Sequence, residues 1–202
     1  EYMVLLAGAH TLYISAHDRF GKRSYRNRAR IQGANNTITL SVPVHGANKG
    51  LASTDMLIDN SQAWQRNHWR SICSAYGKTP YFEYYAADLE PFYQKEYNQL
   101  NQLTEQLLKV CLELCELDLT ICHTELAKLD NITGLIDRHN QLRPSKAWQE
   151  RGIYHPARYV QPFGSDFVPN LSILDLLFNE GPNARSILLA SRQKKAEYVG
   201  DE

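Results

Sequence analysis

Two alternating segments within residues 22–44 give the clearest pattern of apolar and polar positions in this chain, and together they predict a β-hairpin. Side chains of an extended strand point alternately to opposite faces, so Arg26, Arg28 and Arg30 share one face of the first segment. The second segment alternates an apolar face with a polar one, formed by Ile38, Leu40, Val42 and Val44 and by Thr37, Thr39 and Ser41. Residues 33–36 between them are Gly-Ala-Asn-Asn, which tolerate the positive φ angles of tight turns. We expect the arginine face to lie opposite the Thr/Ser face, with the apolar faces toward the core.

Apolar residues at helical spacing predict several helices. The clearest spans residues 97–117, with an apolar stripe formed by Leu100, Leu103, Leu107, Val110, Cys111 and Leu114. Ser61 is expected to cap a helix that runs to Tyr76 and is closed by Gly77. Ser172 and Asp175 fit a capping box for a helix that ends at residues 179–181.

Shorter patterns predict a helix within residues 1–10 and strands at residues 11–16 and 120–123. Strands that alternate with helices indicate an α/β or α+β fold, and 202 residues suffice for one sizeable core. We therefore expect a single domain over residues 1–192, in which several helices pack a small mixed β-sheet with a basic hairpin. Residues 193–202 are expected to form a charged tail.

Charge and composition limit the partners and the compartment. Lys plus Arg and Asp plus Glu both number 22, so no overall field attracts nucleic acid, and we expect no nucleic-acid partner. No apolar run approaches the roughly 20 residues that span a bilayer, and no secretory pattern is visible. The 4 cysteines form no CxxC pair, so we expect reduced thiols and a cytoplasmic protein.

The arginine face is the first candidate for chemistry. Three guanidinium groups spaced by two residues, with Lys22 and Arg23 just upstream, suit a phosphate or a carboxylate. The alternative is a solvated outer face whose charge is balanced by acids elsewhere in the chain.

Two histidines are candidates for acid–base catalysis. His17 and Asp18 follow a predicted strand, so His17 could act as a general base that Asp18 orients. A surface histidine beside a turn-forming aspartate is the alternative. His68 shares a helix face with Trp64 and Ile72, which favours a core residue satisfied by one hydrogen bond over a second catalytic group.

The cysteines raise the question of a metal. Cys111 and Cys115 are one helical turn apart, and Cys122-His123 follows a short loop, so the four side chains could bind zinc. Cys111 lies in the leucine stripe, however, where cysteine behaves as a small apolar residue. We favour core packing, and we expect no metal and no cofactor.

Four motifs stand in a fixed order along the chain. They are YRNR at residues 25–28 followed by Arg30-Ile31, LSVPV at residues 40–44, the aromatic series Trp64, His68-Trp69, Tyr76 and Pro80-Tyr81-Phe82, and PNLSILDLLFNEGP at residues 169–182. In this order they resemble the WbqC-like family of bacterial proteins, especially its Bacteroidetes branch. That family usually begins with a strand and a Pro-rich turn, so we expect its first strand to be missing before residue 1.

The resemblance implies a role in surface-polysaccharide (O-antigen) biosynthesis. It also adds candidate binding residues to the arginines, and the implied substrate-binding set is Arg23, Tyr25, Arg26, Asn27, Arg28, Arg30, Tyr76, Asn170 and Asn179. Asn170 and Asn179 enter by resemblance alone, because a helix entry and a helix stop would also explain them.

Two functions follow from these observations. The first is an acyl or aminoacyl group transferase that holds an anionic donor or sugar nucleotide on the arginines, with His17, Asp18 and His68 as catalytic residues. The second is a non-catalytic module that binds a carrier or partner protein. A catalytic domain predicts that the arginines and both histidines converge on one cleft, whereas a binding module predicts an open arginine face beside exposed aromatics.

Overall fold

The strands of the protein form two separate pairs. The computed structural model describes residues 1–15, 18–21, 24–47, 49–125, 129, 132–138 and 141–192. Within them, β1 (Thr11–Ser15) pairs in parallel with β4 (Thr120–Thr124), and β2 (Arg28–Gln32) pairs antiparallel with β3 (Thr37–Ser41). The predicted strands are therefore confirmed, but they belong to two small sheets instead of one.

The hairpin of β2 and β3 has the predicted register. Arg28 lies opposite Ser41 and Arg30 lies opposite Thr39, so the arginine face does meet the Thr/Ser face. The Gly33 amide donates to the Asn36 carbonyl at 2.9 Å and closes the turn. On the other face Ile31 is completely buried, and this residue fixes the hairpin onto the core.

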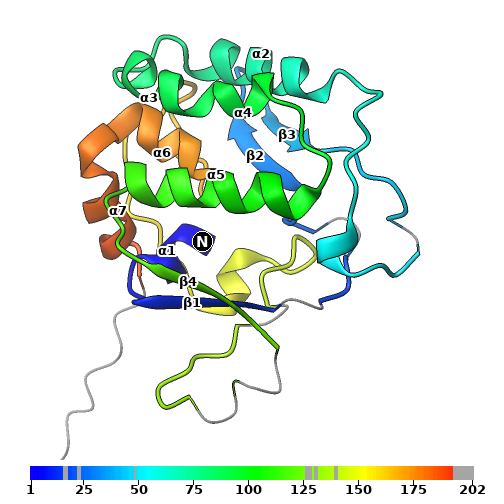
Figure 1. Ribbon diagram of the computed structural model, residues 1–202. Coiled ribbons are helices and arrows are strands. Elements are labelled where there is room, and N and C mark those ends of the chain that lie inside the picture. The colour runs from blue at the N-terminus through cyan, green and yellow to red at the C-terminus, as the bar shows by residue number, and fades with distance from the viewer. Residues whose placement is uncertain are drawn as a thin grey trace, which may run out of the picture.

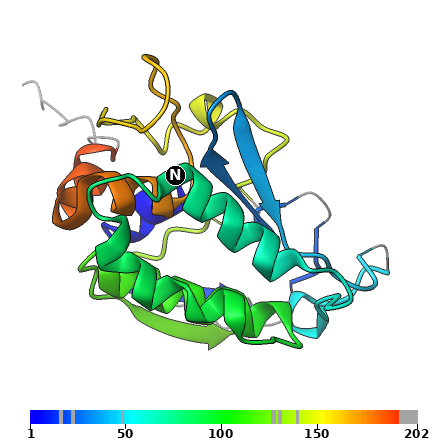
Figure 2. The ribbon, with the colours of Figure 1, turned by 90° about the horizontal axis from the view of Figure 1, so that it is seen from above.

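Helices surround these strands. Their bounds are α1 (Tyr2–Leu6), α2 (Trp64–Tyr76), α3 (Phe82–Leu89), α4 (Pro91–Gln94), α5 (Leu100–Leu114), α6 (Ile173–Glu180) and α7 (Ala184–Ala190), with 3-10 turns η1 (Ser53–Asp55), η3 (Trp148–Arg151) and η4 (Gly181–Asn183). Figure 1 and the view from above in Figure 2 both place α5 between the hairpin and the β1–β4 pair. No helix in the described ranges is long and apolar enough to cross a membrane.

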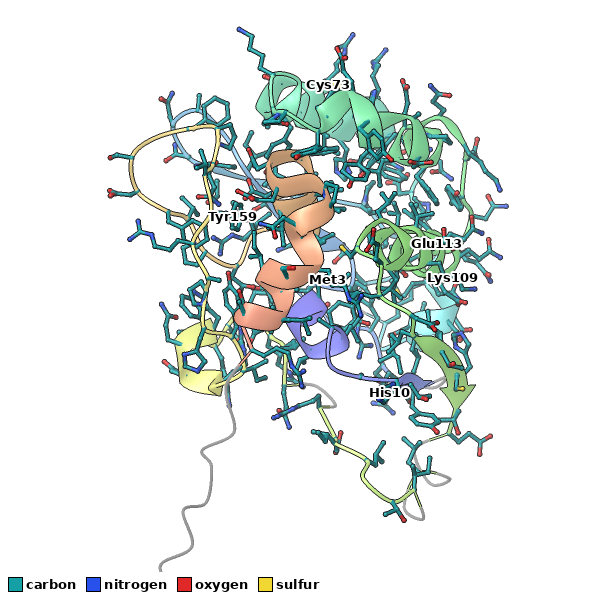
Figure 3. The ribbon with its side chains drawn as sticks, turned by 90° about the vertical axis from the view of Figure 1, so that its left-hand side faces the viewer. Met3, His10, Cys73, Lys109, Glu113 and Tyr159 are labelled. Carbon is teal, nitrogen blue, oxygen red and sulfur yellow. The ribbon has the colours of Figure 1, made fainter. Side chains whose placement is uncertain are left out.

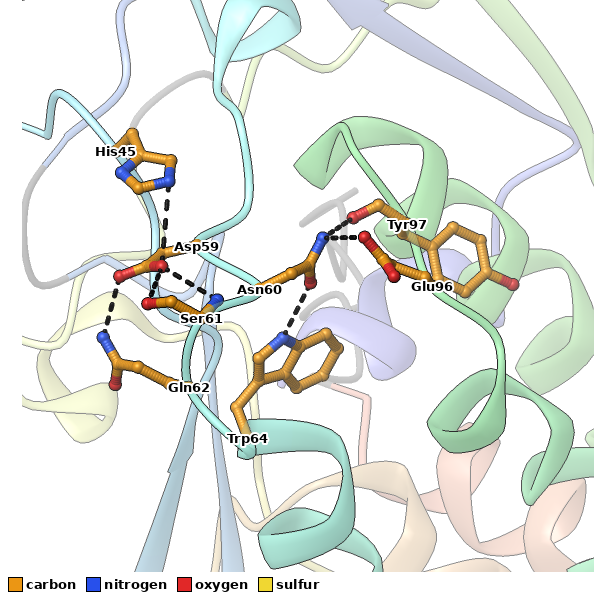
Figure 4. Close-up of polar contacts among 8 residues, drawn as sticks. All are labelled: His45, Asp59, Asn60, Ser61, Gln62, Trp64, Glu96 and Tyr97. Atoms are coloured by element: carbon orange, nitrogen blue, oxygen red, sulfur yellow. Dashed lines mark hydrogen bonds and ion pairs between the residues drawn. The ribbon is translucent and has the colours of Figure 1, made fainter.

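Helix α2 begins two residues later than predicted. Its N-cap is Ala63, and the Ser61 hydroxyl instead donates to Asp59 Oδ1 at 2.5 Å (Figure 4). Asp59 also accepts from the Gln62 amide at 3.0 Å, so the carboxylate organises the turn that leads into the helix. Ser61 lies two residues before the N-cap position, in this turn, so it does not cap the helix.

Helix α6 begins at the predicted cap. Ser172 Oγ accepts from the Leu174 amide at 3.4 Å, while the Ser172 amide donates to the Arg30 carbonyl at 2.7 Å and so joins α6 to β2. The Asp175 side chain does not return to Ser172 as a capping box requires; it is completely buried and makes other contacts.

The core consists of two clusters that share α5. The larger cluster packs α1, the hairpin, α2, α6 and α7 together, and Figure 3 shows Met3 of α1 close to the last helices. The smaller one packs Phe20, Met56 and Trp64 against the start of α5. Leu107 of α5 contacts both clusters, which confirms the predicted apolar stripe and unites the elements in one mixed α/β domain.

Candidate anion-binding site

The arginine face of the hairpin, defined by Arg28, Arg30 and Gln32, concentrates buried polar atoms that lack partners. These residues alternate along β2 and share one face. Five buried side-chain polar atoms of the described residues have no hydrogen-bond partner, and three of them are Arg28 Nε, Arg30 Nε and Gln32 Oε1. An unpaired buried polar atom costs about 1–3 kcal/mol, and most are paired. Because three of these atoms share one face of one strand, we treat the arginine face as the candidate binding site.

The two guanidinium groups on this face carry charge without a counterion. Arg28 and Arg30 are half-buried, and neither side chain forms an ion pair or hydrogen bond with any residue in the described ranges. Across the hairpin they face the neutral residues Ser41 and Thr39. Two planar cationic forks, about 7 Å apart along the strand, suit a phosphate or carboxylate group.

Gln32, at the end of the same face, is held in one orientation. Its side chain is 4% exposed, its amide Nε2 donates to the Phe163 carbonyl at 2.8 Å, and its backbone amide donates to the Tyr76 hydroxyl at 3.0 Å. A flipped amide would place oxygen against the carbonyl oxygen of Phe163, so Oε1 is the free acceptor.

Arg26 lies outside this face, although the alternation placed it there. β2 begins at Arg28, and Arg26 stands in the preceding turn. Its guanidinium donates to Asp18 Oδ2 and to the Arg19 carbonyl, each at 2.9 Å, and to the Ser53 hydroxyl. The predicted row of three arginines is therefore a pair, and Arg26 fastens two loops to the hairpin.

His68 is a core residue of α2. It is 8% exposed, its ring packs edge-on against Trp64 at 5.3 Å and Tyr93 at 6.4 Å, and its Nε2 lies 3.2 Å from the Ser41 carbonyl. Burial lowers the pKa of His68, and the hydrogen bond to the carbonyl of Ser41 opposes this shift. The structure thus places His68 where a neutral imidazole supports β3, as the core interpretation predicted.

A second polar cluster surrounds Asp175. Its Oδ1 accepts from the Tyr76 hydroxyl at 2.9 Å, and its Oδ2 accepts from the Tyr159 hydroxyl at 2.5 Å and from Gln161 Nε2 at 2.8 Å. Burial raises the pKa of Asp175, while these hydrogen bonds oppose the shift. Tyr76 therefore belongs to this cluster, whereas Asn179 donates its side-chain amide to the backbone carbonyl of Asp175 at 2.7 Å. Figure 3 shows Tyr159 beside α6.

The other two predicted asparagines make backbone contacts. Asn27 donates Nδ2 to the Val42 carbonyl at 2.8 Å and extends the hairpin beyond the ladder. Asn170 has a positive φ of 57° just before α6, and its backbone amide lies 3.4 Å from the Tyr154 hydroxyl. Asn170 Oδ1 also accepts from the Glu1 amino group at 3.0 Å. Neither asparagine belongs to the arginine face, and their role in substrate binding stays a prediction.

A separate basic pocket is formed by the 141–151 segment. It has a volume of about 320 Å³ and is lined by Gln141, Arg143, Lys146 and Arg151. Arg151 forms a bidentate pair with Glu1, from Nε to Oε1 at 2.7 Å and from Nη2 to Oε2 at 2.5 Å, and both side chains are buried. Tyr25, the first residue of the YRNR motif, is exposed in the turn before β2.

The cysteines of α5 belong to the core. Cys111 is 8% exposed and Cys115 is 1% exposed, and burial raises the pKa of each thiol to about 12. Both side chains pack in the larger core cluster, in agreement with the predicted packing role. His123 on β4 instead pairs with Glu105, at 3.1 Å from Nε2 to Oε2.

The predicted site residues therefore separate into several places. Arg28 and Arg30 stay together, Arg26 joins Asp18, Tyr76 and Asn179 join Asp175, and His68 supports β3. His17 and Arg23 lie outside the described residues.

Comparison with known proteins places this arrangement in a family. The WbqC-like protein family matches residues 1–142 and 141–187. The chain belongs to the WbqC-like protein family. This family is associated with polysaccharide biosynthesis loci. The chain is also similar to the uncharacterized protein Rv1507c of Mycobacterium tuberculosis, at 26% identity over 95% of this chain and 93% of that protein. No solved structure matches the chain.

Sequence analysis of this WbqC-like protein missed two residues that matter at the arginine face and beside it. Gln32 lies two residues after Arg30 on β2, so the alternation of side chains along the strand is sufficient to place it on the same face. Asp175 was assigned a capping role, because its partners Tyr159 and Gln161 come from a segment with no regular pattern.

Proposed function

We propose that this protein binds the phosphate or carboxylate of an activated donor at Arg28 and Arg30, and that it acts as a group transferase in polysaccharide biosynthesis. The observation that carries this proposal is the pair of half-buried guanidinium groups without a counterion in the described ranges. A partly desolvated cation attracts an anion more strongly than an exposed one, because water screens it less. The association of the WbqC-like family with polysaccharide loci supports a donor from that chemistry.

Within this proposal His17 is the candidate proton acceptor for the accepting amine or hydroxyl. It precedes Asp18, whose carboxylate is bound by Arg26, and Arg26 is two residues from Arg28. His68 is the weaker candidate, since its ring nitrogen is hydrogen-bonded to the Ser41 carbonyl inside the core.

The test is isothermal titration calorimetry with inorganic phosphate, acetyl phosphate and a nucleoside diphosphate sugar. We expect Arg28→Gln and Arg30→Gln each to weaken the bound probe at least tenfold, because a charge-assisted hydrogen bond contributes about 1.5–3 kcal/mol. Arg70→Gln is the matched control, since Arg70 is an exposed arginine on the outer side of α2. Equal binding by Arg28→Gln, Arg30→Gln and the control would refute the proposal.

A second candidate function is a non-catalytic binding module for a carrier or partner protein. The observation that favours it is that His68 is bonded to the Ser41 carbonyl and Asp18 to Arg26, so neither of these two catalytic candidates is shown at Arg28 and Arg30. His17→Asn separates the two functions. A group transferase loses turnover with unchanged donor affinity in this variant, whereas a binding module keeps its affinity and shows no turnover in either form.

A further inference from the structure

We infer that Gln32 is a specificity residue of the arginine site, and that it selects a sugar phosphate by accepting a hydrogen bond from a sugar hydroxyl. This inference rests on the proposed function, because it requires an anionic group at Arg28 and Arg30. It adds a second requirement to the ligand, namely a neutral hydrogen-bond donor close to the anion.

The position of Gln32 supports this role. Arg28, Arg30 and Gln32 follow one another on the same face of β2, with about 7 Å between successive members. A ligand that lies along this face therefore meets two cationic donors and then one neutral acceptor. A phosphate attached to a polyhydroxylated ring presents the complementary series, an anion followed by hydroxyl groups.

The contacts of Gln32 explain why its oxygen is the group on offer. Its side-chain Nε2 donates to the Phe163 carbonyl at 2.8 Å, and its backbone amide donates to the Tyr76 hydroxyl at 3.0 Å. Tyr76 is itself fixed by Asp175 at 2.9 Å, so the residue is held from two sides. Oε1 is buried and lacks a partner among the described residues. A held acceptor discriminates more sharply than a mobile one, because it cannot turn away to find water.

The charge of the surroundings decides which donor fits. An ammonium group at Gln32 would lie nearest to Arg30, about 7 Å along the strand, and Arg30 has no carboxylate partner in the described ranges. Like charges in a partly buried site repel strongly. A hydroxyl donates without charge, so a sugar phosphate fits better than a phosphate that carries an amine. The exposed parts of the two half-buried arginines provide the side from which such a ligand approaches.

The experiment compares three probes by calorimetry: inorganic phosphate, propyl phosphate and a hexose 1-phosphate, with the gluco, galacto and manno forms tested in turn. The wild-type protein should prefer at least one hexose phosphate over propyl phosphate on the order of tenfold, the effect of one well-placed hydrogen bond. Gln32→Met, which removes the acceptor at similar size, should abolish this preference and leave propyl phosphate binding within about twofold of the wild type. Gln32→Asn, which withdraws the oxygen by one methylene, should do the same and serves if the methionine variant fails to fold.

The outcomes separate this inference from the proposed function. Equal affinity of the wild type for propyl phosphate and all three hexose phosphates overturns the role of Gln32, as does a preference that survives both substitutions. In either case, if Arg28→Gln loses all phosphate binding, the proposed anion site at Arg28 and Arg30 still stands. Phosphate binding that is unchanged in Arg28→Gln and Arg30→Gln refutes the proposed function, and the inference with it.

Discussion

Around Asp175 both carboxylate oxygens are fully hydrogen-bonded, whereas along the arginine face three buried polar atoms have no partner. The two regions adjoin, because the Tyr76 hydroxyl bonds both Asp175 and the backbone of Gln32. The difference indicates that the buried polar groups of the two regions have different roles. The satisfied cluster fixes the 159–168 segment to α6, whereas the arginine face is the region to which we assign ligand binding in our proposal.

The largest effect is expected when the acceptor of the satisfied cluster, the Asp175 carboxylate, is removed. Asp175→Ala leaves the donors of Tyr76, Tyr159 and Gln161 buried without an acceptor, so we expect a loss of about 3–5 kcal/mol in the free energy of unfolding. Urea denaturation followed by circular dichroism measures it. Asp88→Ala, at an exposed position of α3, is the control. A loss below about 1 kcal/mol would show that the cluster does not stabilise the fold.

A smaller effect should distinguish two arginines of the same motif. Arg26→Ala removes an ion pair and two further hydrogen bonds, so we expect a loss of about 1–3 kcal/mol. Arg28→Ala removes a side chain without a partner in the described ranges, so we expect no loss of stability beyond about 0.5 kcal/mol, and relief of the unpaired Nε can raise the stability. Both values come from the same urea titration. If the two variants lost equal stability, Arg28 would be structural and the contrast between the regions would disappear.

The smallest effect concerns the pH dependence contributed by His68. Its pKa in the folded protein lies below the usual value of 6.5, so the unfolded chain binds a proton first as the pH falls. The stability that a neutral His68 provides is therefore complete above about pH 6.5 and is lost as the pH drops below it. We expect His68→Gln to reduce the slope of unfolding free energy against pH in this window by up to about 1.4 kcal/mol per pH unit. Thermal unfolding between pH 5 and 8 measures the slope, and an unchanged slope would assign it to other groups.

Local patterns predicted the local parts of the fold. The register of the hairpin followed from the alternation of Arg28 and Arg30 against Thr39 and Ser41, because a slip of one residue would expose Ile31. The same alternation overextended the strand to Arg26, since the turn that Asp18 and Ser53 impose there depends on loops distant in sequence. Alternation shows which side chains share a face, but not where the ladder stops.

The candidate site was predictable only in part, for the same physical reason. Arg28 and Arg30 were identified from their spacing, but the partners that make Gln32 an oriented acceptor are Phe163 and Tyr76, far along the chain. The pairing of Glu1 with Arg151 likewise joins residues that no local pattern connects. Contacts between distant segments depend on the whole packed structure, so the sequence indicates the residue types of the site but not the residues that contact them.

The parallel pair of β1 and β4 has a consequence for how the chain assembles. Thr11 lies opposite Thr120, so more than half of the chain must emerge from the ribosome before β1 finds its neighbour. The hairpin, in contrast, closes within a short stretch of chain, although the segments that cover it, Phe163 and α6, are translated much later. During synthesis the arginine strand is therefore complete long before its final surroundings exist. At that stage the β2–β3 hairpin of the nascent chain exposes its apolar face to water. Intermediates with exposed apolar surface are prone to aggregate, and chaperones protect them.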